Sequence, residues 1–153
     1  MGEFAKTRDT IKNLKGGLAK INPAINKNTA GLAKDAIDKV LKALDAAVAD
    51  EQNYEKAVAA ADIANKALAA AQAALTQKCN DVKAKLAKLN NGNPQRMSAA
   101  QEGLKWIPQA MDAYTEQKLK EDDGIKALRQ ISVEVMRVNN LSQRPTTGPT
   151  YCP

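Results

Sequence analysis

Residues 68–89 read LAAAQAALTQKCNDVKAKLAKL, and their apolar members recur at steps of seven, four, three, four and three. This spacing is typical of the buried edge of a coiled helix. The edge consists of Leu68, Leu75, Cys79, Val82, Leu86 and Leu89. Only Gln72 places a polar side chain in it. The segment therefore predicts a helix with one narrow apolar seam.

A second apolar stripe begins just after a turn signal at residues 90–94, NNGNP. Gly92 suits a left-handed helix end, Asn93 suits a helix cap and Pro94 suits a first helical turn. The stripe consists of Met97, Ala100, Leu104, Ile107, Met111 and Tyr114. Two helices with one narrow seam each must bury these seams against each other. We therefore expect the chain to double back at Gly92, and the second helix to kink at Pro108.

The segment 6–27 predicts a short, lysine-rich amphipathic helix that ends near Ile21, because Pro23 follows. Asn28 or Thr29 can cap the next helix. Its apolar pattern changes phase at residues 49–53, where the chain has no glycine or proline. We interpret this as one continuous helix of roughly 60 residues, about 90 Å long. The alternative is a corner between two helices.

The sequence as a whole predicts an all-α fold, an elongated antiparallel helical hairpin or coiled-coil bundle with a short N-terminal amphipathic helix. A polar interruption at residues 121–124 leaves a compact four-helix bundle as the alternative, with corners near Asp50 and Asp123. Residues 1–5 are expected to be a disordered, cloning-derived start. Residues 6–141 then form a single helical domain, and residues 142–153 form a tail rich in proline, threonine and glycine.

The two cysteines leave two possibilities open. Cys79 lies on the apolar seam, whereas Cys152 lies in the tail, which has no reason to be ordered unless something fastens it. A disulfide between them would fasten the tail and indicate an oxidising compartment. We expect an intramolecular bridge to accompany the compact bundle, because the tail scarcely reaches Cys79 along a fully extended hairpin. The alternative is a pair of free thiols.

The chain shows little that supports catalysis or ligand binding. It has no histidine, which removes the commonest general base and transition-metal ligand. We expect no enzyme activity, no cofactor and no metal site. The acidic residues 121–123 lack the ligand spacing of a calcium loop, so we interpret them as a solvated break. Asn140, Leu141 and Ser142 match the glycosylation pattern, which matters only in a eukaryotic secretory pathway.

The net charge of +6 is concentrated in the N-terminal segment and just before residue 90. Six lysines in these two regions are candidates for an interaction surface: Lys12, Lys15, Lys20, Lys83, Lys85 and Lys88. We predict a non-enzymatic interaction or scaffold module that binds a protein or a second copy of itself, with an extracellular or cell-surface location favoured. The alternative is a membrane-active protein that uses segment 6–27. Nucleic-acid binding is not expected, because the lysine-rich segments lack the interleaved aromatic residues that stack on bases.

Overall fold

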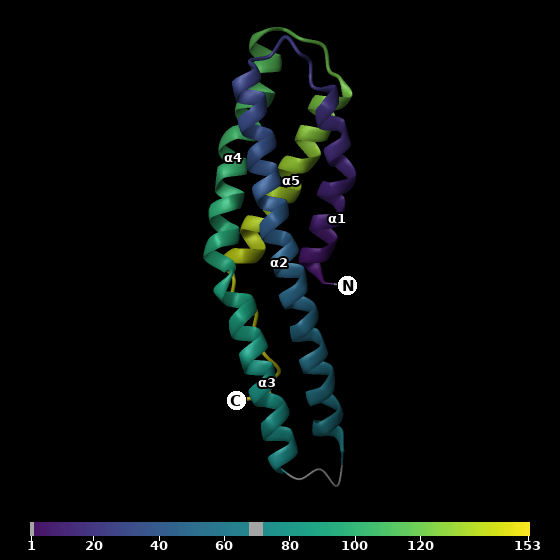
Figure 1. Cartoon of the computed structure of the whole chain (residues 1–153), viewed down its shortest axis with the longest axis vertical. Coiled ribbons are helices and arrows are strands. Elements are labelled where there is room, and N and C mark those ends of the chain that lie inside the picture. The colour runs from purple at the N-terminus through teal and green to yellow at the C-terminus, as the bar shows by residue number, and fades with distance from the viewer. Residues whose placement is uncertain (1, 68–71) are drawn as a thin grey trace.

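The computed structural model describes residues 2–67 and 72–153, and within these residues all regular structure is helical (Figure 1). The elements are α1 (Glu3–Lys15), the 3-10 helix η1 (Gly16–Lys20), α2 (Lys27–Lys66), α3 (Gln72–Asn91), α4 (Asn93–Glu116) and α5 (Asp123–Gln143). The prediction of an all-α helical bundle is confirmed.

The molecule combines the two predicted arrangements. Helices α1, α2, α4 and α5 form a four-helix bundle at one end (Figure 1). Helix α2, with 40 residues and a length of about 60 Å, continues beyond the bundle and pairs with α3 in a two-helix arm. We call residues 51–66 of α2 together with α3 the distal arm. The long hairpin thus consists of α2 on one side and of α3 followed by α4 on the other.

The predicted reversal at Gly92 is wrong. The direction of the chain reverses between α2 and α3, whereas α3 and α4 follow one another along the same side of α2 (Figure 1). Gly92 has φ −81° and ψ −8°, which is right-handed helical geometry, so it interrupts the helix without turning the chain. Asn93 does not provide the expected cap, because it is the first residue of α4 and its side chain is buried. Pro94 follows it in the first turn of that helix. Helix α3 consequently packs along α2, and α4 packs on both α2 and α5.

The other predicted helix boundaries agree with the structure only in part. Helix α2 passes through residues 49–53 without a break, as expected, but it ends at Lys66 and so has 40 residues instead of 60. Its cap is Asn26, whose side-chain oxygen accepts hydrogen bonds from the N–H groups of Asn28 and Thr29. A corner does separate α4 from α5, and α4 continues through Pro108.

Most predicted seam positions face the interior. Cys79, Val82, Leu89, Ile107 and Tyr114 are buried. The partly buried members of the two seams are Leu75, Leu86, Met97, Leu104 and Met111, and Leu68 lies outside the described residues. The largest cluster of buried side chains lies inside the four-helix bundle, whereas the distal arm has a small cluster of its own. The bundle is therefore the well-packed end of the molecule.

The expectation that residues 1–5 are disordered is wrong for residues 3–5, which begin α1. Phe4 and Ala5 are buried, and the Arg96 guanidinium lies over the Phe4 ring, 4.7 Å from its centroid. Burial of one aromatic ring in the bundle is sufficient to hold this segment in place. Residue 1 lies outside the described residues.

Two glycines make a matched stability test of the bundle. A Cβ atom added at Gly124 in α5 would lie 2.5 Å from the backbone N and Cα of Ile21, so we expect Gly124→Ala to lower the free energy of unfolding by about 2 kcal/mol. Gly31 in α2 has open space around the same position, so Gly31→Ala should raise it by roughly 0.5–1 kcal/mol. Urea unfolding measures both changes. Equal effects of the two substitutions would contradict the close approach of α5 to Ile21.

Candidate interaction surfaces

The C-terminal tail is fastened to the distal arm by a disulfide. The sulfur atoms of Cys79 and Cys152 are 2.07 Å apart, and their Cα atoms are 5.3 Å apart. We expected an intramolecular bridge to accompany the compact bundle, and the structure contains this bridge in a molecule that combines a four-helix bundle with a two-helix arm. Helix α5 runs back from the outer end of the bundle and ends beside the middle of the molecule, so the short tail reaches α3 (Figure 1).

Side-chain contacts also hold the tail along its length. The Asn90 side chain donates a hydrogen bond to the Thr146 carbonyl and accepts one from the Thr146 N–H, both at 2.9 Å. The Tyr54 hydroxyl donates to the Thr147 carbonyl at 3.1 Å, and the Tyr151 hydroxyl donates to the Asp62 carboxylate. Tyr151 and Cys152 pack on the small apolar cluster of Ala57, Ala61 and Val82. The tail thereby covers part of the distal arm.

The Tyr151 contact predicts a late tyrosine titration. The hydrogen bond to Asp62 raises the pKa of Tyr151 to about 12, above its usual value of 10.0. The contact is therefore fully retained below pH 10 and is lost as the pH rises through about 12. Phenolate absorbance should show one step near pH 12 that disappears in Tyr151→Phe and moves toward pH 10 in Asp62→Asn. An unchanged step in Asp62→Asn would contradict the contact.

Most candidate lysines are engaged within the chain. The ion pairs are Lys12 with Asp45 at 3.4 Å, Lys15 with Asp38 at 2.7 Å, Lys20 with Asp123 at 3.4 Å, Lys85 with Asp81 at 3.8 Å and Lys88 with Asp50 at 3.6 Å. Lys83 is exposed and makes no ion pair with the described residues. Several of these pairs join α1 or η1 to neighbouring helices. The six lysines do not form one free cationic surface.

The acidic residues 121–123 hold the corner before α5 together. The Asp122 carboxylate caps α5 by accepting a hydrogen bond from the Ile125 N–H at 2.9 Å, and it accepts another from the Tyr114 hydroxyl. Asp123 pairs with Lys20, and Glu121 pairs with Arg129. Across residues 2–67 and 72–153, no group of three or more potential metal ligands comes together. Among the same residues, no helix is both long enough and apolar enough to span a bilayer.

A buried arginine, which no pattern in the sequence predicted, links three parts of the molecule. Arg96 donates hydrogen bonds to the Leu89 carbonyl at 2.7 Å and to the Asn93 side chain at 2.5 Å. Burial lowers the pKa of its guanidinium, and the carboxylates of Asp50 and Glu51 oppose this effect. Burial likewise raises the pKa of Glu51. Arg96 satisfies a carbonyl at the end of α3 and so stabilises the junction of α3 with α4.

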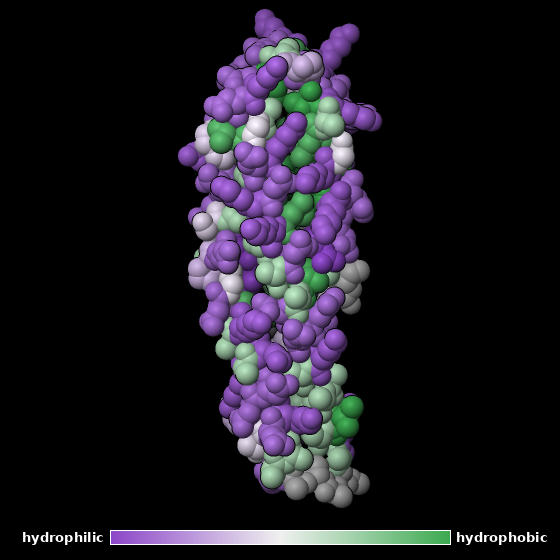
Figure 2. All heavy atoms as spheres, viewed as in Figure 1, coloured by the Kyte–Doolittle hydropathy of each residue, from purple (hydrophilic) through white to green (hydrophobic). Residues whose placement is uncertain are grey.

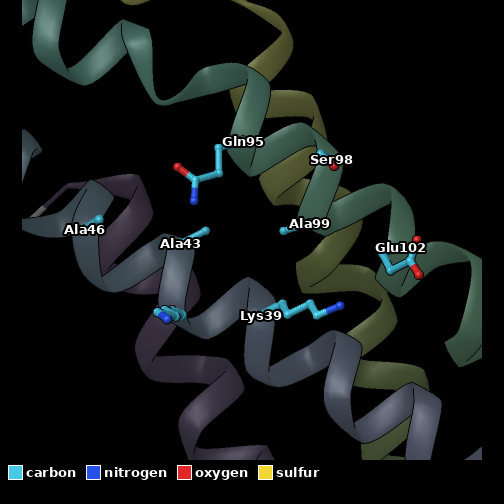
Figure 3. A pocket seen from close by; sticks show the side chains of 8 residues that line it. Lys39, Ala43, Ala46, Gln95, Ser98, Ala99 and Glu102 are labelled. Carbon is cyan, nitrogen blue, oxygen red and sulfur yellow. The ribbon is translucent and has the colours of Figure 1, made fainter.

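An open groove of about 730 Å³ lies between α2 and α4 (Figure 3). We call it the α2–α4 groove. It is lined by Lys39, Lys42, Ala43, Ala46, Gln95, Ser98, Ala99 and Glu102. The methyl groups of Ala43 and Ala99 point toward each other across it (Figure 3). No pattern in the sequence predicted this groove, although residues 39, 42, 43 and 46 lie on one face of α2 and residues 95, 98, 99 and 102 on one face of α4.

Three exposed apolar side chains lie elsewhere: Ile63 on the distal arm, and Val133 and Met136 on α5. Figure 2 shows hydrophilic residues over most of the visible face, a strip of strongly hydrophobic residues along its upper half, and mainly weakly hydrophobic residues toward the end of the distal arm. Ile63 stands alone, as single apolar side chains commonly do on protein surfaces. Val133 and Met136 together line a hollow of about 460 Å³ on α5, which is smaller than the α2–α4 groove.

No protein-family model, curated protein or solved structure matches this chain.

Proposed function

We propose that this chain is a non-enzymatic helical interaction module that binds another protein through the α2–α4 groove. The observation that carries the proposal is the groove itself, which has a floor of small side chains and a charged rim. Open concave surfaces that combine apolar and polar residues are suited to recognition.

The surroundings of the groove favour binding without rearrangement. On the opposite faces of the two helices, Ile37, Val40, Leu44 and Ile107 are buried in the bundle core. The backbone on both sides of the groove is therefore held in place by packing, which lowers the cost of ordering on association. The disulfide adds support for an oxidising setting, so we propose an extracellular or cell-surface location.

The membrane alternative finds no support in the bundle. In segment 6–27, Ile11, Leu18 and Ile25 are buried. Lys12 and Lys15 pair with carboxylates of α2. Insertion into a lipid interface would require α1 to leave the core and to break these contacts.

Residue-specific photo-crosslinking tests the proposed function. We would place a benzoylphenylalanine at Ser98 in the groove and, as the matched control, at Gln130, which is exposed on α5. In the fluid or extract from which the protein comes, position 98 should give one discrete adduct, and position 130 should give none. The Ala43→Glu substitution should abolish the adduct from position 98. Light scattering after size exclusion identifies an adduct of two copies. Equal adducts from both positions, or none from position 98, would overturn the proposal.

A further inference from the structure

The asparagine of the glycosylation pattern at residues 140–142 lies on the exposed face of α5, near the end of that helix. This is the one Asn-x-Ser/Thr triplet in the whole sequence, and such a triplet is the acceptor for an N-linked glycan. Asn140 lines two neighbouring hollows of about 460 and 510 Å³. The surface is therefore open at the position where a glycan would be attached.

Two of the three large apolar side chains that are exposed among the described residues lie on the same face of α5 as Asn140. Val133 and Met136 precede Asn140 by seven and four residues, which are the spacings of neighbours on one helical face. They are 59% and 45% exposed, and they line the smaller of the two hollows together with Asn140. A pair of exposed apolar side chains in one hollow marks a surface that another group can cover.

The direction of the Asn140 side chain brings an attached group toward this pair. Side chains on an α-helix lean toward the N-terminus of the helix, so a residue covers the turn that precedes it. Here that turn carries Met136 and Arg137, and Val133 lies about 10 Å from Asn140 along the helix axis. Sugar rings have apolar C–H faces and a rim of hydroxyl groups. The hollow matches them with an apolar floor and with polar groups from Ser132 and Arg137.

The serine of the triplet shows when the glycan would have to be added. Ser142 is 2% exposed, and its hydroxyl oxygen has no hydrogen-bond partner among the described residues. A glycosyl transferase has to reach this hydroxyl as well as the asparagine, and the packed end of α5 does not present it. The transfer therefore precedes the packing of this helix end, and the folded protein then keeps the Asn140 side chain outside.

We propose that Asn140 carries an N-linked glycan whose first sugars cover Val133 and Met136. In the transfer, Nδ2 of Asn140 forms a bond to the anomeric carbon of an oligosaccharide held on a lipid pyrophosphate. The bond from that carbon to the pyrophosphate oxygen breaks, the lipid pyrophosphate leaves, and the amide gives up one proton. This inference rests on the proposed extracellular location and assigns it to a eukaryotic secretory pathway. It does not involve the α2–α4 groove, so either proposal can fail alone.

Mass spectrometry of the protein isolated from its natural source tests the modification. Peptide N-glycosidase should remove one glycan and convert Asn140 to aspartate. In eukaryotic cells that secrete the chain, Asn140→Gln and Ser142→Ala should each abolish the glycan, and Ser142→Thr should retain it. Ser142→Ala removes only a buried hydroxyl without a partner, so this variant should fold as the wild type does. An unmodified Asn140 in the natural protein would overturn the proposal.

Hydrophobic interaction chromatography tests whether the glycan covers the two apolar side chains. The glycosylated wild type should elute earlier than Asn140→Gln, and this difference should shrink when both forms also carry Val133→Ser/Met136→Ser. The matched control is Ile63→Ser, because Ile63 is the third exposed apolar side chain and lies on the distal arm. It should shorten the retention of both forms equally and leave their difference unchanged. The same difference in all three backgrounds would overturn the covering of Val133 and Met136.

Discussion

Replacing Cys152 by serine should lower the free energy of unfolding by about 4 kcal/mol. The disulfide closes a loop with a sequence separation of 73 residues, and a cross-link of this span removes many conformations from the unfolded chain. It also keeps Tyr151 against the small apolar cluster of the distal arm. Urea unfolding of wild type and Cys152→Ser measures the difference.

The part of the molecule that is destabilised distinguishes loss of the disulfide from a general loss of packing. Hydrogen exchange in Cys152→Ser should become fast in residues 144–153, while the amides of α4 and α5 in the bundle stay protected under native conditions. Reduction of the wild type should reproduce the change, and reductant should have no further effect on Cys79→Ser/Cys152→Ser. An unfolding midpoint that does not respond to the loss of the bridge would contradict the fastening role.

Replacing Arg96 by methionine should lower the free energy of unfolding by about 3 kcal/mol. Methionine keeps much of the side-chain volume but leaves the Leu89 carbonyl and the Asn93 side chain without the donor that now serves both. The substitution also removes the positive charge beside Asp50 and Glu51. Unfolding by urea, followed by circular dichroism, measures the loss.

Arg144→Met is the matched control for this substitution, because Arg144 is exposed and follows the last residue of α5. It should change the free energy of unfolding by no more than about 0.5 kcal/mol. If Arg96→Met behaved like this control, the junction between α3 and α4 would not depend on the buried guanidinium.

Local periodicity was sufficient to predict the helices but insufficient to predict where the chain turns. The repeat through Val82 and Leu89 marks a buried helical face whatever its partner is. Residues 90–94 carry a strong interruption signal, but a glycine in right-handed geometry allows the next helix to continue along the same partner. Between Lys66 and Gln72 the sequence contains only alanine and leucine, so no glycine or proline predicted that α3 would run antiparallel to α2.

The α2–α4 groove was harder to predict than the fold because it depends on which helices become neighbours. Lys12 and Lys15 belong to a cationic segment in the sequence, yet the approach of α1 to α2 pairs them with Asp45 and Asp38. Lys39, in contrast, lies on a helix of mixed charge, and only the placement of α4 beside α2 reveals it as part of a groove rim.

Since the 40 residues of α2 run without a break from the bundle into the distal arm, this helix sets the distance between the groove and the end of the arm. The centre of the groove at Ala43 and the end of the helix at Lys66 are separated by about 35 Å of continuous helix. A ligand held at the first position and a neighbour touching the second would be kept at this spacing.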